Sequence, residues 1–299
     1  MGKPTETRCK NMKELVVISG KGGTGKTSIT AAIAMLATNN ILVDCDVDAA
    51  NLHLITGSNV LNKQEFMAGF EAEIDLERCR KCGRCINFCK FEAISEKFII
   101  NKLHCEGCGV CAFQCLHQAI SLKNKHAGHW FISQTRFGKL VHAQLGLAVE
   151  NSGKLVSQVR NQAKKLAEVE NNQLIITDGP PGVGCPAIAA VTGADLVLSV
   201  VEPSVSGMHD LERVVKLTNH FGLQLLVCIN KATLNKENTQ NLIKWCEEKN
   251  IEVVGEIPYS DKFNQALRVR KTILEIENAE LKQDIVSMWE KILQKLNNF

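Results

Sequence analysis

Residues 20–28, Gly20-Lys21-Gly22-Gly23-Thr24-Gly25-Lys26-Thr27-Ser28, decide the fold. The first eight fit the spacing GxxxxGK[ST], follow the apolar run Leu15–Ser19 and open a helical pattern. Glycines let backbone N–H groups close on phosphate oxygens, and the start of a helix adds positive potential. In such a loop Lys26 reaches the β and γ phosphates and the Thr27 hydroxyl ligates Mg²⁺. The stretch therefore predicts a phosphate-binding loop; a glycine-rich turn that binds nothing is the alternative.

A second acidic group for the metal is found later in the chain. Asp178 ends the apolar run Leu174–Thr177 and is followed by Gly-Pro-Pro-Gly at 179–182. A carboxylate at the end of a strand commonly completes the Mg²⁺ shell beside a phosphate-binding loop. We expect Asp178 to take this role with Thr27, and the alternative is a helix cap.

The rhythm of apolar runs indicates the fold class. Strands are predicted at Leu15–Ser19, Ile41–Asp44, Leu174–Asp178, Leu196–Val201, Leu225–Asn230 and Val253–Ile257. Helices are predicted at Lys26–Thr38, Lys154–Glu168, Met208–Phe221 and Asn238–Lys249. Short strands alternating with longer helices predict an α/β fold, a mostly parallel sheet with helices on both faces. A last helical stripe of Leu281, Ile285, Trp289, Ile292 and Leu296 is expected to dock on the core rather than on a membrane.

Cysteine interrupts this rhythm. Eight of the 13 cysteines fall between Cys79 and Cys115, and the segments 79–94 and 105–120 resemble each other. In a reducing compartment such a block indicates a metal or cluster site rather than disulfides. We therefore expect residues 73–125 to be an inserted small α+β domain of the bacterial ferredoxin type, within an ATPase domain of residues 1–72 and 126–299.

The cysteine spacing suggests which cofactor this insertion holds. The pattern CxxCxxCxxxC occurs twice, and in bacterial two-cluster ferredoxins the fourth cysteine of each run ligates the other cluster. The expected [4Fe–4S] ligand sets are Cys79, Cys82, Cys85 with Cys115, and Cys105, Cys108, Cys111 with Cys89. Zinc is the alternative. Lys90 and Leu116 stand where these ferredoxins usually have proline, so we expect an altered potential or exposure rather than absent clusters.

The loop GKGGTGKT, with its additional Lys21, resembles the deviant Walker A family of P-loop ATPases, which includes MinD, ParA, Mrp-type scaffolds and the nitrogenase iron protein. The resemblance implies ATP with Mg²⁺ and a homodimer with nucleotide at its interface. It implies that Lys21 reaches the partner's phosphates, as a cation supplied in trans that makes hydrolysis depend on assembly. Catalysis would then use Lys21, Lys26 and a switch residue.

Further motifs extend the same resemblance. The switch I pattern DxDxxxxN is matched by Asp44, Asp46 and Asn51, with Asp46 assigned to the attacking water. Switch II is matched by 178–182, ending at Gly182. Asn230 in CINKA and Pro258 in GEIPYS resemble adenine-side contacts, although an asparagine after a strand and a proline in a turn are also common where such elements end.

Composition limits the partners. The formal charge of +3 and 45% hydrophobic content give no electrostatic reason to expect nucleic acid, and no apolar run spans a bilayer. The start MGKPTETRCK has no apolar signal segment, so we expect a cytoplasmic protein without membrane contact.

Several residues have no clear assignment. Cys185 lies seven residues after Asp178, and we expect a small buried residue, with a cluster or metal ligand as the alternative. Cys9, Cys45, Cys228 and Cys246 are expected to be structural. Residues 126–153 carry His129, Arg136 and His142, and are expected to form a solvated loop and an edge strand, or else a partner surface.

Three functions are consistent with these features. The preferred one is an ATPase that gates electron transfer to, or maturation of, a partner metalloprotein through the cluster insertion. The second is a scaffold or carrier that assembles clusters for apo-proteins. The third, placed last, is a positioning ATPase of the MinD/ParA kind.

Overall fold

The computed structural model describes residues 12–146 and 152–298. The chain divides into two compact units, one of Met1–Gln64, Trp130–Gln144 and Ser152–Phe299, the other of Glu65–His129 and Leu145–Asn151. The predicted insertion, residues 73–125, falls inside the second unit. Each unit is described in its own terms below.

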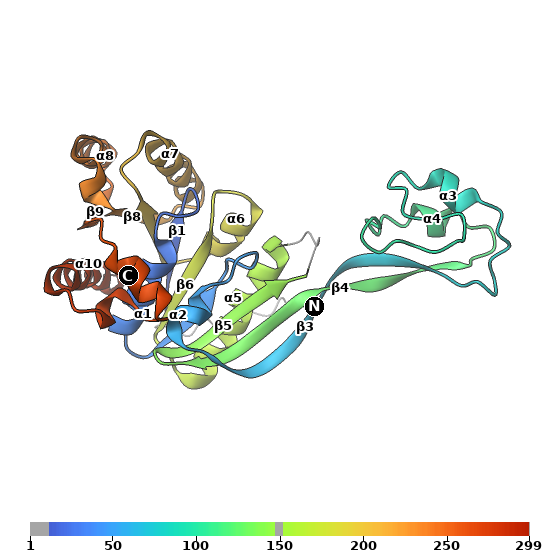
Figure 1. The fold of residues 1–299 in the computed structure, drawn as a ribbon, viewed down its shortest axis with the longest axis horizontal. Coiled ribbons are helices and arrows are strands. Elements are labelled where there is room, and N and C mark those ends of the chain that lie inside the picture. The colour runs from blue at the N-terminus through green and yellow to red at the C-terminus, as the bar shows by residue number, and fades with distance from the viewer. Residues whose placement is uncertain (1–11, 147–151, 299) are drawn as a thin grey trace, which may run out of the picture. The chain divides into compact units, whose positions relative to one another are not determined.

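The strands form one sheet in the order β3-β4-β5-β2-β6-β1-β7-β8-β9 (Figure 1). Their bounds are β1 Lys13–Ser19, β2 Asn40–Asp44, β3 Asn59–Ile74, β4 Ile120–Thr135, β5 Gly138–Leu145, β6 Leu174–Pro181, β7 Leu196–Val201, β8 Gln224–Asn230 and β9 Glu252–Ile257. The run from β5 through β2, β6, β1, β7 and β8 to β9 is parallel throughout. The six predicted strands are all present, and a mostly parallel sheet is confirmed.

Parallel pairing fixes the place of the functional residues. Val17 of β1 and Asp44 of β2 both lie opposite Asp178 of β6 in the register of the sheet. Asn230 is the last residue of β8, opposite Ile257 of β9. Because parallel strands end at the same edge, their carboxyl ends gather the loop after β1, Asp44, Asp178 and Asn230 on one side.

Helices lie on both faces of the sheet of the first unit. Their bounds are α1 Lys26–Leu36, α2 Leu52–Thr56, α5 Ser152–Glu170, α6 Cys185–Val191, α7 Val205–His220, α8 Lys236–Glu248, α9 Lys262–Arg268 and α10 Ala279–Asn297, with single 3₁₀ turns at Ala232–Leu234 and Ile273–Glu275. The four predicted helices are confirmed within three residues at each end.

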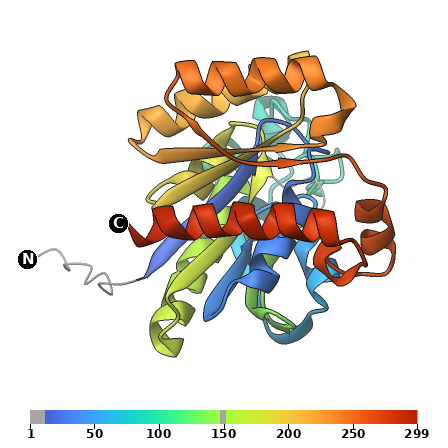
Figure 2. The ribbon, with the colours of Figure 1, turned by 90° about the vertical axis from the view of Figure 1, so that its left-hand side faces the viewer.

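Strand alternation divides the core between these faces. Leu15 and Val17 belong to the cluster that includes α1 and α10, and Figure 2 shows α10 lying across this face. Val227 and Ile229 of β8 point the other way, against α7 and α8. The α10 stripe predicted to dock on the core does so: Leu281, Ile285, Trp289, Ile292 and Leu296 are at most 5% exposed.

The second unit repeats one small motif. Helices α3 Arg84–Phe88 and α4 Val110–Phe113 each follow a glycine in the left-handed region, Gly83 with φ 76° and Gly109 with φ 78°. A cluster of buried residues, among them Ala72, Cys85, Cys105 and Ile120, lies between them. The sequence duplication is therefore also a structural one.

Some expectations about this part of the chain need correction. Residues 126–146 are not a solvated loop with an edge strand, because β4 and β5 lie inside the sheet, between β3 and β2. Residues 147–151 and Cys9 lie outside the described residues. Cys185, expected to be buried, is exposed at the start of α6, whereas Cys45, Cys228 and Cys246, which were expected to be structural, are buried. Within the described ranges, no helix combines the length and apolar character needed to cross a membrane.

Candidate functional site

The loop between β1 and α1 is fixed by contact with β8. Gly25 has φ 90°, and a Cβ at this position would lie 2.3 Å from Nδ2 of Asn230. That same Nδ2 donates to the Thr24 carbonyl at 2.7 Å, and Asn230 is only 3% exposed. Asn230 therefore supports the backbone of the loop, and only glycine fits at position 25.

Lys26, Thr27 and Asp178 come together at the base of the loop. Lys26 Nζ lies 2.8 Å from Asp178 Oδ1, and the Thr27 hydroxyl donates to Oδ2 at 2.7 Å. The Thr30 hydroxyl donates to Oδ1 at 2.9 Å. Burial alone lowers the pKa of Lys26, but the adjacent Asp178 carboxylate more than offsets this, so the pKa is raised. Lys26 therefore remains a cation in a buried site.

The switch I residues lie beside this pair. Asp44 is fully buried, and its carboxylate accepts from the backbone N–H groups of Leu52 at 3.0 Å and Asp46 at 3.1 Å. Burial, followed by the nearby charge of Asp178, raises the pKa of Asp44 to about 7. Burial also raises the pKa of Asp46, although Lys26 opposes the shift. Asp44 therefore shapes the start of α2, while Asp46 lies at the open side.

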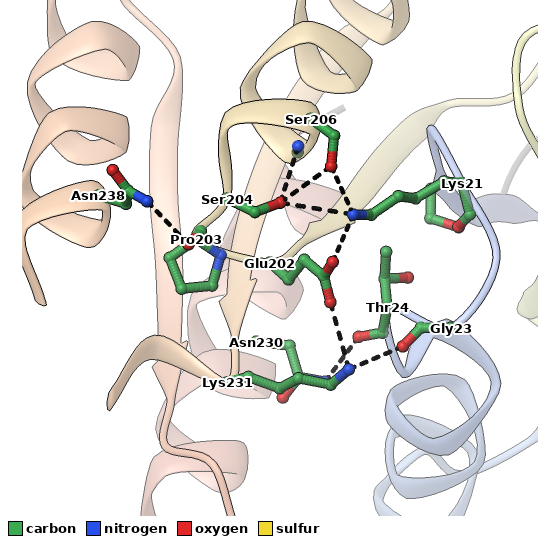
Figure 3. A network of polar contacts seen from close by, with 12 residues as sticks. Lys21, Gly23, Thr24, Glu202, Pro203, Ser204, Ser206, Asn230, Lys231 and Asn238 are labelled. Atoms are coloured by element: carbon green, nitrogen blue, oxygen red, sulfur yellow. Dashed lines mark hydrogen bonds and ion pairs between the residues drawn. The ribbon is translucent and has the colours of Figure 1, made fainter. Parts of the chain in front are cut away.

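Lys21 points away from the phosphate loop, toward the start of α7 (Figure 3). Its ammonium forms an ion pair with Glu202 and donates to the Ser206 hydroxyl at 2.8 Å and to the Ser204 hydroxyl at 3.4 Å. The Lys21 side chain is 30% exposed and that of Glu202 is 22% exposed. The lysine is thus held within its own chain.

Glu202 also binds a second lysine. Lys231 Nζ lies 3.2 Å from Glu202 and donates to the Gly23 carbonyl at 2.9 Å, as Figure 3 shows. Burial would raise the pKa of Glu202, but hydrogen bonds and charges from Lys21 and Lys231 lower it overall. Glu202 therefore holds two lysines at once: Lys21, which belongs to the phosphate loop, and Lys231, which binds the carbonyl of Gly23 in that loop. Sequence reasoning missed Glu202 and Lys231, although Glu202 directly follows the carboxyl end of β7, where such groups gather.

A cavity of about 830 Å³ opens above the loop. Its walls include Gly22, Gly23, Thr24, Gly25, Lys26, Thr27, Ser28, Asp46, Asn51, Asn230 and Pro258. Tyr259 and Phe263, which the sequence analysis did not select, line it next to Pro258. Gly20, Lys21, Asp44, Asp178 and Gly182 do not belong to its lining. The size matches a cofactor-sized site, and two aromatic rings supply apolar surface beside the phosphate loop.

The second unit brings the eight cysteines together in two sets. One hollow is lined by Cys79, Cys82, Cys85 and Cys115, and another by Cys89, Cys105, Cys108 and Cys111. Each set takes three cysteines from one repeat and one from the other, which is the grouping that the spacing predicted. Arg80 and Arg84 line the first hollow, and Glu106 the second.

Backbone N–H groups point at several of these sulfurs. Ala93 donates to Cys89 Sγ at 3.4 Å, and Ala119 donates to Cys115 Sγ at 3.3 Å. The fourth cysteine of each repeat therefore accepts the same bond, from the residue four positions later. Hydrogen bonds of this kind orient the sulfur of a cysteine that serves as a metal ligand.

A glycine-rich loop between a parallel strand and a helix, with a lysine, a threonine and a strand-end aspartate at its base, defines a P-loop nucleotide-binding protein. The model of the CobQ/CobB/MinD/ParA nucleotide binding domain matches residues 15–273, so the chain belongs to this family of MinD/ParA-type P-loop ATPases.

Individual relatives show how much of the chain this similarity covers. The "uncharacterized protein MJ0578" of Methanocaldococcus jannaschii is 34% identical over 93% of this chain and 96% of its own length. The septum site-determining protein MinD of Buchnera aphidicola is 28% identical over 67% of this chain and 57% of its own. Among solved structures, MinD of Pyrococcus horikoshii complexed with Mg-ADP has a TM-score of 0.57 at 17% identity, covering 94% and 96% of the two chains. That last likeness concerns the fold alone.

These comparisons bear unequally on the three functions considered. A MinD/ParA-type ATPase, the function placed last, fits them better than the preferred iron–sulfur function does. The ATPase part of the prediction is therefore confirmed at the level of the family, and the redox part stays a prediction.

Proposed function

We propose that the protein is a Mg²⁺-dependent ATPase of the MinD/ParA type whose second unit holds two [4Fe–4S] clusters. ATP binding, hydrolysis and homodimerisation gate electron transfer to, or maturation of, a partner metalloprotein. The observation that carries the proposal is the combination, in one chain, of a nucleotide cavity and two hollows that are each lined by four cysteines.

The nucleotide part rests on the residues at the cavity floor. Lys26 and Thr27, which both bind Asp178 in this structure, would hold phosphate and Mg²⁺, and Asp178 would contribute to the surroundings of the metal. Asp46 lines the same cavity and is the group to orient the attacking water. The solved structure of Pyrococcus horikoshii MinD is complexed with Mg-ADP, which supports a nucleotide with Mg²⁺ as the ligand of this cavity.

The arrangement of the cysteines favours a cluster over zinc. Paired CxxC units also build tetrahedral zinc sites, but four cysteines per repeat, with three from one repeat and one from the other lining each hollow, suit a [4Fe–4S] cluster better.

Bound clusters would supply one-electron chemistry, and the protein contributes the surroundings. The N–H groups of Ala93 and Ala119 stabilise the thiolates of the two crossing cysteines. Residues 77–125 carry nine basic and four acidic side chains, which offset the negative charge of two thiolate-bound clusters. Leu116, next to Cys115, is 76% exposed and would offer a partner an apolar contact beside the first set.

Iron and sulfide counts on anaerobically purified protein test the cluster assignment. We expect about eight irons per chain in the wild type and about four in Cys115→Ser, because only the first set loses a ligand. Cys185→Ser is the matched control, since this exposed cysteine lies outside both sets. Bound zinc in place of iron, or equal iron loss in Cys185→Ser, would contradict the assignment.

A separate experiment tests whether the bound nucleotide affects the clusters and their partner. The reduction potentials and the affinity for a captured partner should differ between ATP-bound and ADP-bound protein. If potential, partner affinity and dimerisation were all insensitive to the nucleotide, ATP would not gate the clusters.

A positioning ATPase of the MinD/ParA kind is the second candidate, because several relatives, among them the protein of Buchnera aphidicola, are septum site-determining MinD proteins. ATP-dependent co-sedimentation with liposomes or DNA would favour it. A cluster carrier would instead transfer iron and sulfide to an apo-ferredoxin within minutes, while a redox protein would retain both clusters through repeated reduction.

A further inference from the structure

Two histidines and a glutamate meet on neighbouring strands of the second unit. Glu65 belongs to β3, and His126 and His129 belong to β4. One ligand atom from each residue can be chosen so that all three lie within 4.8 Å of one another. The centroids of the two imidazole rings are 4.7 Å apart, and the rings are inclined at 62°.

This meeting requires a departure from regular strand geometry. Residues three positions apart on a strand point to opposite faces, yet the rings of His126 and His129 are in contact. Between them lies Gly128, with φ 154°, a backbone value that side chains disfavour. The irregular backbone at this glycine turns both imidazoles to the side where β3 presents Glu65.

The donor set selects a class of ion. Two imidazole nitrogens and one carboxylate oxygen suit divalent zinc, cobalt, nickel or iron, whereas Ca²⁺ and Mg²⁺ prefer oxygen alone. Bonds of about 2.1 Å hold donor atoms about 3 to 4 Å apart, so small side-chain rotations bring these three into place. Three protein ligands leave the remaining positions to water.

The surroundings leave the site accessible. Glu65 and His126 are exposed and His129 is half-buried. Within residues 12–146 and 152–298, the side chains of Glu65 and His126 form no other hydrogen bond or ion pair, so binding breaks none of theirs. The cysteine hollows draw on different residues, which makes the two kinds of site separable by mutation.

We propose that Glu65, His126 and His129 bind one divalent first-row transition-metal ion, distinct from the nucleotide's Mg²⁺ and from the cysteine ligands. Because the ligands come from two strands, the ion links β3 to β4. This site does not depend on the proposed ATPase or cluster function.

Cobalt binding tests the proposal, with Co²⁺ added to the anaerobically purified full chain in equilibrium dialysis. We expect one equivalent bound without the near-ultraviolet thiolate-to-cobalt band that cysteine ligands would produce. Glu65→Gln and His126→Ala should each weaken this binding by at least about 10- to 100-fold, the loss that removing a group behind a ligand already causes. His209→Ala and Glu212→Gln are matched controls, because these exposed residues of α7 form a His–Glu pair at 3.8 Å, and both should bind like the wild type.

Any of three outcomes would contradict the proposed metal site. The wild type binds no cobalt, Glu65→Gln and His126→Ala bind it with unchanged affinity, or a thiolate band accounts for all the bound cobalt. Circular dichroism checks that each variant is folded. Should His126→Ala lose its fold, the near-isosteric Glu65→Gln at an exposed position decides the question alone.

Discussion

The ammonium of Lys21 forms an ion pair with Glu202 of its own chain, at the start of α7. Lys21 is the residue that resemblance assigns to the phosphates of a partner subunit. In the single chain it is therefore engaged elsewhere, and it has to leave Glu202, Ser204 and Ser206 before it can act in trans.

Releasing Lys21 should favour assembly. In Glu202→Gln the lysine loses its charged partner, a partly exposed contact worth about 1 kcal/mol; two such contacts break per homodimer, so about 2 kcal/mol corresponds to roughly 30-fold tighter ATP-dependent dimerisation. Sedimentation velocity with Mg-ATP measures this change. Glu212→Gln, on the helix α7 that begins three residues after Glu202, is the control, and weaker dimerisation in Glu202→Gln would show that Glu202 supports the dimer instead.

Substituting the two lysines of the phosphate loop one at a time should separate nucleotide binding from dimerisation. Lys26→Ala removes the cation beside Asp178 and should weaken Mg-ATP binding by about 100-fold or more. Lys21→Ala should leave affinity within about threefold of the wild type but abolish ATP-dependent dimerisation, since Lys21 does not line the cavity. Nucleotide titration of both variants checks this, and near-normal affinity in Lys26→Ala would contradict the loop assignment.

Asp44 should make stability depend on pH. Its pKa is raised to about 7 in the folded protein from an ordinary value of 3.8. The folded state therefore holds a proton that the unfolded chain has released, and the free energy of unfolding contributed by Asp44 falls as pH rises from about 4 to 7. Asp44→Asn cannot titrate, so chemical denaturation across this range should show a flatter profile. Identical profiles in both proteins would remove Asp44 as the cause.

A buried ion pair away from the site should govern stability. Arg160 of α5 donates to Glu14 of β1 at 2.6 and 2.8 Å, and to the carbonyls of Ala189 and Thr192 at 2.8 Å each. Arg160→Ala leaves the Glu14 carboxylate buried with less compensation and should cost about 3–5 kcal/mol of unfolding free energy. Denaturant titration measures the loss.

The double variant Glu14→Gln/Arg160→Met provides the comparison for this pair. Removing both charges leaves no uncompensated ion, so the double variant should be less destabilised than Arg160→Ala. A double variant that is equally or more unstable would mean that packing around Arg160, and not the orphaned charge, causes the loss.

The central strands of the sheet could be predicted from their own local sequence. Strands such as Leu196–Val201 are buried on both faces, so their continuous apolar character identifies them without any knowledge of neighbours. The loop and its aspartate were predictable for a related reason, since parallel strands bring their carboxyl ends to one edge. The grouping of the cysteines was expected from the pattern of bacterial two-cluster ferredoxins, because local spacing alone does not say that Cys89 and Cys115 join the other repeat.

Features that depend on distant partners were not predictable. Strand β3 was not predicted: residues 59–65 are all exposed and show no apolar alternation, and the alternation of Phe66, Ala68, Phe70, Ala72 and Ile74 lies beside the cysteine-rich segment, where the strand–helix rhythm lapses. The role of Glu202 depends on Lys21 and Lys231, which are distant in sequence. Cys185 was expected to be buried because cysteine commonly is, but its place at the start of α6 is exposed.

The crossing of cysteines between the two repeats has a consequence for how this segment can change. Cys115 sits with three cysteines of the first repeat, and Cys89 with three of the second. Deleting either repeat alone would leave both sets of four cysteines incomplete. The two halves of the duplication can therefore be kept or lost only together if either set is to stay whole.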